Sequence, residues 1–302
     1  MKKSIYILLF LLPLGLVAQQ ESYYSLYKFH MNIINPAYAG AEAGNMFAFT
    51  SRRQWSALED APKTFAFSYS SARKNKVGLG VSIVSDKVFI EQQTFAYIDF
   101  SYRLEMGSET QLFLGLKGGG NFYSADPSSL TSFFEGVDNA KVNLSSFNPN
   151  IGAGAYLQGS AFWASFSIPR LFNVERNDDL AVTAKDRVHS YLAGGASFAV
   201  SNFMLKPSLM MRKVKGLPLT SELTAMIGWQ NRIDIGVSFR SNSSMALMAF
   251  INVGMFDIGY AYEMPSDQQL SGMSLKTHEL VFRIRLEGKQ DTKEGPVIPE
   301  ES

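Results

Sequence analysis

Cysteine is the clearest absence from this sequence, because none occurs among its 302 residues. The chain therefore has no disulfide bonds, thiolate zinc sites, cysteine nucleophile or lipidated cysteine of the lipoprotein kind. An excess of one charge is also missing: 28 Lys and Arg stand against 27 Asp and Glu. Since nucleic-acid-binding domains normally carry a clear basic excess, we expect no nucleic-acid partner.

Long apolar runs are confined to the first residues. Lys2 and Lys3 precede an apolar run over 5–12, and a second run ends at Ala18, before Gln19. This order is typical of a cleavable secretory signal, so residues 1–18 are predicted to be a signal peptide, with a retained anchor as the alternative. After Gln19 no apolar window is long enough for a transmembrane helix. The choice left is between an exported soluble β-protein and a transmembrane β-barrel.

The residue types that are abundant in this sequence favour β-strands. Aromatic residues make up 13% of the chain and there are 24 glycines, a composition that favours strands and tight turns. Apolar residues recur at every second position, as in Ile233, Ile235, Val237 and Phe239, and the same alternation covers most of 45–286. Such a period gives each strand one apolar and one polar face.

A barrel is favoured over a soluble sandwich by three features of these segments. Many are about 9–11 residues long, charges occur in mid-strand, and aromatic residues gather near strand ends. We predict an all-β protein: a transmembrane antiparallel β-barrel of about 14 strands over residues 45–286. An even strand number places both termini in the periplasm of a Gram-negative outer membrane, with lipid around the wall. The soluble sandwich stays open as an alternative.

The charges predicted to face the lumen have two interpretations: they line a water-filled pore, or they pair across the lumen and close it. They are Asp99, Arg103, Lys117, Arg232, Asp234, Arg240, Asp257, Glu263, Arg283 and Arg285.

Two polar ends flank the predicted barrel. Within residues 19–44, which we predict to be an N-terminal periplasmic segment, the residues that recur at helical spacing are Tyr23, Leu26, Tyr27, His30, Met31 and Ile34. They predict a short amphipathic helix that ends before Pro36. Residues 287–302 are charged and contain two prolines, which predicts a flexible periplasmic tail.

No pattern in the sequence indicates catalysis. The three histidines (His30, His189 and His278) are far apart, and no GxSxG motif occurs. His278 and Glu279 are neighbours on a predicted strand, so they point to opposite faces and cannot easily act together. We predict a non-enzymatic protein without metal or cofactor.

Several short blocks, in a fixed order, carry a family resemblance. They are NPAYAG at 35–40, RQW at 53–55, SIPRLF at 167–172, GYAYEMP at 259–265 and THEL at 277–280. Together they resemble the PorP/SprF family of Bacteroidota outer-membrane proteins linked to the type IX secretion system. Lys276 departs from the pattern, since glycine is expected there.

The family-motif positions are interpreted as architectural residues or partner contacts. They are Asn35, Pro36, Ala37, Tyr38, Ala39, Gly40, Arg53, Trp55, Ser167, Pro169, Leu171, Phe172, Tyr262, Pro265, His278 and Glu279. Arg53 and Trp55, two positions apart, are predicted to share one strand face.

The resemblance also implies a function. It suggests a barrel that assists secretion, or surface anchoring through a C-terminal domain, of a large cargo protein such as an adhesin, within the type IX secretion and gliding machinery. The implied partners are that cargo, other type IX components and a periplasmic peptidoglycan-binding protein. The alternative is a passive porin or solute channel.

Overall fold

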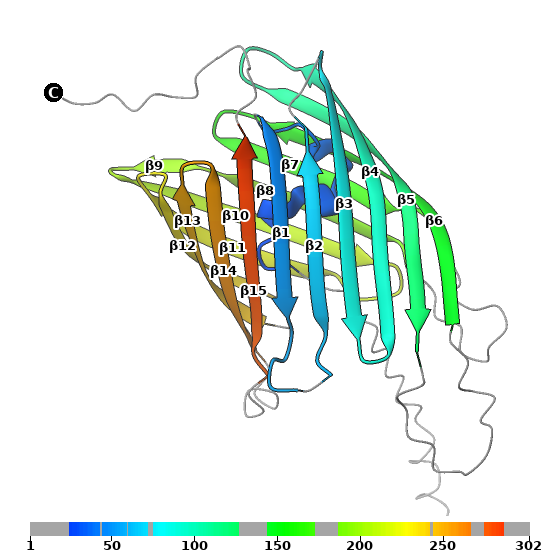
Figure 1. Cartoon of the computed structure of the whole chain (residues 1–302). Helices are drawn as coiled ribbons and strands as arrows, with labels where there is room; N and C mark the ends of the chain where they lie inside the picture. Colours follow the sequence, from blue (N-terminus) through cyan, green and yellow to red (C-terminus); the bar gives the residue numbers. More distant parts are fainter. Residues whose placement is uncertain are drawn as a thin grey trace, which may run out of the picture.

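The computed structural model describes residues 24–42, 44–58, 60–71, 75–126, 144–172, 187–241, 244–266 and 275–286 (Figure 1). Its strands are β1 (Asn45–Arg53), β2 (Lys63–Ser70), β3 (Val77–Val88), β4 (Glu91–Glu105), β5 (Gln111–Ala125), β6 (Leu144–Gln158), β7 (Phe162–Arg170), β8 (His189–Ala196), β9 (Phe198–Val200), β10 (Phe203–Val214), β11 (Thr220–Trp229), β12 (Ile233–Arg240), β13 (Ser244–Val253), β14 (Phe256–Pro265) and β15 (Thr277–Leu286). β8 and β9 are separated only by Ser197, and both pair antiparallel with β10. They fill one position, so the wall has 14 strand positions.

The strands form one closed antiparallel sheet. Neighbours in the chain are neighbours in the wall, and β1 pairs with β15 to close it, with Asn45 opposite Leu286. The predicted antiparallel barrel of about 14 strands is confirmed, whereas a sandwich of two packed sheets is wrong. None of the helices in the described part of the chain is long and apolar enough to cross a membrane.

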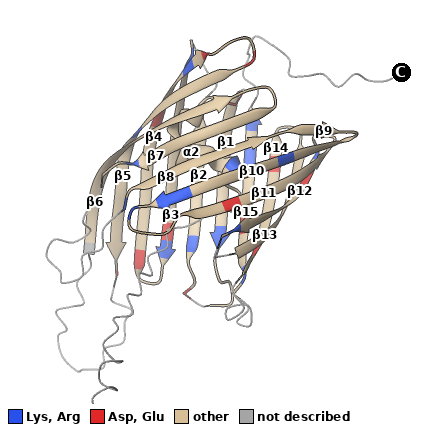
Figure 2. Ribbon diagram, turned by 180° about the vertical axis from the view of Figure 1, so that it is seen from behind, with Lys and Arg blue, Asp and Glu red and all other residues tan. Residues whose placement is uncertain are grey.

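The outer face of the wall carries large exposed apolar side chains, whereas its inner face combines buried polar and charged residues with apolar side chains that pack against residues 24–42. In β11 the exposed Leu223 and Ile227 alternate with the buried Glu222 and Thr224. Uncharged residues dominate the strands, with Lys, Arg, Asp and Glu in scattered positions (Figure 2). This arrangement suits a wall in contact with acyl chains and a lumen that accommodates charge.

The two ends of the barrel differ in their links. We call the end with Asn45 and Leu286 the terminal end, and the end with Arg53 and Thr277 the far end. Links at the terminal end are short, and the turns at Asn75-Lys76 and Gln230-Asn231 have positive φ at both residues, as primed hairpin turns require. The longer links, at 54–62, 126–143, 171–188 and 266–276, are at the far end.

The lumen contains residues 24–42, which we call the plug. Its helical part consists of 3-10 helix η2 (Tyr27–His30), α2 (Met31–Ile34) and 3-10 helix η3 (Pro36–Tyr38), visible inside the ring of strands in Figure 1. The helical stretch before Pro36 agrees with the prediction. The periplasmic position predicted for residues 19–44 needs correction, because the described part of this segment is largely buried within the barrel. Helical periodicity shows that one face is covered but not what covers it. The predicted signal peptide (1–18) and tail (287–302) lie outside the described residues.

Candidate functional site: the plug and its seat in the lumen

Asn35 fixes the plug to the wall. Its side-chain amide donates hydrogen bonds to the carbonyl oxygen of Ala155 (2.9 Å) and to Ser165 Oγ (2.8 Å), and its Oδ1 accepts one from the Ala37 amide (2.9 Å). Asn35 is fully buried, so each of these polar atoms needs its partner. This set explains why asparagine precedes Pro36 in the NPAYAG block.

Serines of the wall hold the plug backbone on both sides of Asn35. Ser167 Oγ donates to the carbonyl oxygen of Ile34 (2.6 Å), and Ser101 Oγ donates to that of Ala39. Ser70 Oγ accepts from the Gly40 amide (2.6 Å). The serine of the SIPRLF block therefore bonds the residue directly before NPAYAG, which brings two family motifs far apart in the sequence next to each other.

Glycines make room for the plug along the same path. A Cβ added to Gly78, Gly115 or Gly154 would lie well inside 3.0 Å of the plug, against Ala39, Ala37 and Asn35 respectively. Such approaches require a wall without side chains at these points. We call the serines and glycines that contact residues 34–40 the plug seat.

A buried ion pair supports the middle of the plug. Lys117 Nζ lies 2.7 Å from Asp99 Oδ1, and both side chains are almost fully buried. The same ammonium donates to the carbonyl oxygen of Asn32 in the plug (3.0 Å) and to Ser82 Oγ (3.1 Å). This pair was predicted to face the lumen, and here it binds plug backbone.

His30 lies buried in the plug with its Nδ1 3.4 Å from Ser68 Oγ. Burial, and secondarily the positive charge of Arg283, lower the pKa of this imidazole from 6.5 to about 3. His30 is therefore neutral at pH 7, and it is not available as a cationic group.

Five charged side chains form a network at the far-end side of the plug. Arg52 bonds Glu279 and Glu263, each at 2.9 Å, and Arg240 bonds Glu263 at 3.0 Å and Glu222 at 2.8 Å. All five are nearly buried. Three carboxylates face two guanidinium groups, which leaves one excess negative charge within the network.

The plug supplies the missing hydrogen-bond donors. The backbone amides of Ser25 and Leu26 donate to the two Glu279 oxygens at 2.9 and 3.1 Å, and Ser25 Oγ donates to Glu263 (2.8 Å). A buried carboxylate is tolerated only when its oxygens are satisfied in this way. The network therefore anchors the first described residues of the plug.

The other predicted lumen charges lie near the terminal end. Asp257 bonds Arg285 (3.0 Å), Asp234 bonds Lys206 (2.8 Å), and Arg283 bonds Glu42 of the plug. Arg103 is half-buried beside Glu105 at the edge of this end. Arg232 needs correction: it was predicted to face the lumen from a strand, but it is exposed on the turn before β12.

The structure corrects the prediction for Arg53 and Trp55. β1 ends at Arg53, and Trp55 lies in the following link with a φ of 51°, so they do not share a strand face. Arg53 is exposed, while its neighbour Arg52, which sequence reasoning missed, points into the lumen. Glu222, Lys206, Glu42 and Ser25 were missed as well, and the inward phase of their strands was the only signal for the first two.

The remaining motif residues lie around the far end. Glu279 points inward, while His278 points outward to the Tyr260 hydroxyl (2.7 Å) and the edge of Tyr262. The SIPRLF block ends where Asn150 Oδ1 accepts from the amides of Leu171 and Phe172 (3.0 and 3.1 Å). Pro169 is the penultimate residue of β7 and lies against Gly152, and Pro265 pairs with Ser244.

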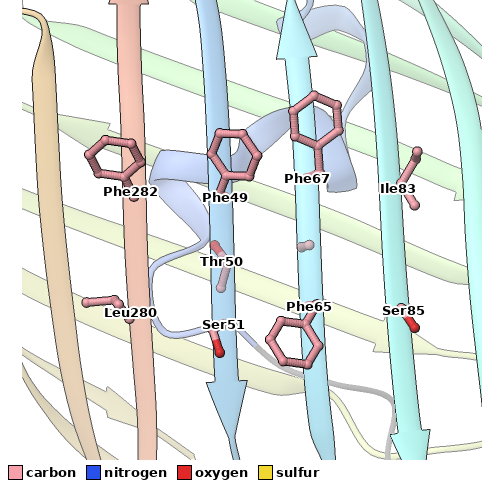
Figure 3. Close-up of a pocket in the computed structure, with 10 residues that line it drawn as sticks. Phe49, Thr50, Ser51, Phe65, Phe67, Ile83, Ser85, Leu280 and Phe282 are labelled. Carbon is pink, nitrogen blue, oxygen red and sulfur yellow. The ribbon is translucent and has the colours of Figure 1, made fainter.

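An apolar hollow of about 340 Å³ lies on the outer face of β15, β1, β2 and β3. Figure 3 shows Ser51 between Leu280 and Phe65 in one row, with Phe282, Phe49 and Phe67 in the next. The hollow exists because Ser51 is small among large outward side chains. On a membrane-facing wall such a hollow is suited to acyl chains.

The described residues form no group of three or more His, Asp or Glu that could hold a metal ion. The arrangement places residues 24–42 of the chain inside its own lumen. The closed sheet, apolar exterior and occupied lumen define an outer-membrane type of β-barrel with an internal plug.

Comparison with known proteins gives the family. The sequence matches the family described as type IX secretion system membrane protein PorP/SprF over residues 16–284, and the chain belongs to it. The resemblance seen in the motif blocks is therefore confirmed. No curated protein matches the sequence.

Several solved structures are similar to this chain at low identity. The CymD monoaromatic hydrocarbon channel is 12% identical, with a TM-score of 0.50, covering 87% of this chain and 94% of that chain. The P. putida toluene transporter TodX is 9% identical (TM-score 0.49, covering 85% and 94%), and the Ralstonia pickettii toluene transporter TbuX is 8% identical (TM-score 0.47, covering 83% and 92%). The first of these supports the barrel fold and nothing more specific.

Proposed function

We propose that this protein is a non-enzymatic outer-membrane barrel that assists secretion or surface anchoring of one large cargo protein, such as an adhesin with a C-terminal docking domain. The observation that carries the proposal is a lumen filled by the plug in a chain of a type IX secretion family. A barrel closed by buried hydrogen bonds and ion pairs is poorly suited to bulk diffusion. Its partners are then proteins, and the longer links at the far end are the surface they contact.

The orientation is part of the proposal. Short turns at the terminal end and longer links at the far end match the usual periplasmic and extracellular sides of such barrels. The cargo then meets the far end, and periplasmic components, including a peptidoglycan-binding protein, meet the terminal end.

The test is capture of the tagged protein from detergent-solubilised outer membranes, followed by mass spectrometry. We expect one large surface protein and type IX components, and neither with an equally tagged unrelated barrel. Deletion of the gene should release that cargo into the medium or leave it unexported. Recovery of the barrel alone, together with unchanged display of every type IX cargo, would contradict the proposal.

The passive porin is the competing function, and conductance in planar bilayers separates the two. The intact chain is expected to be nearly silent, whereas a chain lacking residues 24–42 should conduct, because the plug occupies the lumen. Steady channels from the intact chain would favour the porin.

A further inference from the structure

A polar pocket of about 380 Å³ lies at the terminal end, between the plug and strands β10 to β15. Its basic lining consists of Lys206, Arg232, Arg283 and Arg285. Three carboxylates, those of Glu42, Asp234 and Asp257, face them. The pocket is therefore a mixed cluster with one more basic than acidic group, and its volume lies within the usual range of ligand pockets.

Pairing within the pocket leaves one cation without an acidic partner. Each of the three carboxylates already bonds a base, in the pairs Asp234 with Lys206, Asp257 with Arg285, and Glu42 with Arg283. The Arg232 side chain is exposed on its turn and has no ion pair or hydrogen bond to any residue in the described ranges. A guanidinium group binds carboxylates in paired hydrogen bonds, so a carboxylate-bearing group would give Arg232 an acidic partner in this pocket.

We propose that this pocket binds the acidic C-terminal segment of the same chain, residues 287–302, through its carboxylates. The segment contains Glu287, Asp291, Glu294, Glu300 and Glu301 against only Lys289 and Lys293. It follows directly on Leu286, one residue after Arg285 of the pocket. The negative charge of this segment and its attachment beside Arg285 therefore both suit the pocket.

The tether makes modest affinity sufficient. A segment attached beside its site has an effective concentration on the order of 1 mM. At about 3.3 Å per extended residue, a few residues reach across the pocket. Bound carboxylates would lie beside Arg283, which holds Glu42, so the tail and the plug share one basic cluster. The inference does not depend on the cargo role.

The binding test uses two forms of the full barrel in detergent: the intact chain and a chain that ends at Leu286. A fluorescent peptide of residues 287–302 is titrated and its anisotropy measured. We expect the shortened chain to bind the peptide at about 0.1 mM and the intact chain about tenfold more weakly, because its own tail competes.

Controls locate the site. In the shortened chain Arg232→Ala should weaken peptide binding several-fold, whereas Lys215→Ala, on an exposed turn at the far end, should not. A peptide with its acids replaced by amides should not bind. No binding to the shortened chain, equal binding to both forms, or indifference to Arg232→Ala would each overturn the proposal.

Cross-linking gives a second readout, since the chain has no cysteine of its own. Asn252 lines the pocket, so Asn252→Cys combined with Glu300→Cys should give an intramolecular cross-link with a short bismaleimide. Lys215→Cys with Glu300→Cys is the matched control and should not. Equal yields from the two pairs would overturn the proposal.

Discussion

Single residues decide how closely the plug and the wall approach each other. The plug runs over Gly78, Gly115 and Gly154, where an added Cβ would overlap the plug backbone at the first two and the Asn35 side chain at the third. Glycine elsewhere in the wall has a different role, since a Cβ on Gly118 would meet nothing within 4 Å. Of these two glycines of β5, only Gly115 is therefore needed for the close approach of the plug.

This contrast gives a matched pair of substitutions. Gly115→Ala should loosen the plug, because its methyl group overlaps Ala37 and Pro36, at a cost of about 1–3 kcal/mol or about 5- to 150-fold in plug occupancy. Gly118→Ala should have no such effect. Conductance in planar bilayers measures both, and equal silence of the two variants would contradict the role given to Gly115.

His30 gives the plug a dependence on pH. Its pKa is about 3 when seated and near 6.5 when exposed, so the released plug binds more protons between these values. Seating is therefore strongest above pH 6.5 and weakens as the pH falls towards 3. Conductance should rise over this interval in the native chain and less in His30→Gln. An identical pH profile in both would assign the effect to other groups.

Among structural elements, the plug and strands β1, β11, β12, β14 and β15 are joined by the five-charge network. Arg52 bridges two carboxylates that come from different strands, and backbone amides of the plug donate the other hydrogen bonds to Glu279. Removing one partner of a buried ion pair leaves an uncompensated buried charge, which costs far more stability than forming the pair contributes. Arg52 is therefore needed to hold these elements together.

Replacing Arg52 should therefore cost much more than replacing its neighbour. Arg52→Met leaves Glu263 and Glu279 short of a counter-charge, and we expect a loss of about 3–5 kcal/mol in the free energy of unfolding. Arg53→Met, at an exposed position, should change it by less than about 0.5 kcal/mol. Urea unfolding in detergent micelles measures both. Similar values for the two variants would show that the network is not a stability element.

At the scale of the whole molecule, the two ends of the closed wall are expected to face opposite sides of the membrane. The turn at Gly254-Met255 belongs to the terminal end and Lys215 to the far end. The proposed orientation places the first in the periplasm and the second at the cell surface.

Cysteine labelling checks this orientation, since no native cysteine interferes. A membrane-impermeant maleimide on intact cells should label Lys215→Cys and spare Met255→Cys, while broken cells should allow both. Labelling of Met255→Cys alone on intact cells would reverse the orientation.

The sequence by itself determined the class of fold. Period-two alternation and strand length are local properties, and they predicted an antiparallel barrel over residues 45–286, the bounds set by the start of β1 and the end of β15. The motif blocks determined the family, and helical spacing before Pro36 predicted the helical part of the plug.

Only the tertiary structure decided which of these parts meet. Alternation shows that Glu279 and Lys117 face inward, but not that they bind Ser25 and Asn32 of a plug. The end of β1 was also misjudged: Arg53 and Trp55 were expected to share a strand face, but the strand ends at Arg53. Arg52 and Glu279 are separated by 227 positions and become neighbours because β1 and β15 close the wall. Such contacts depend on closure and register, which no local pattern encodes.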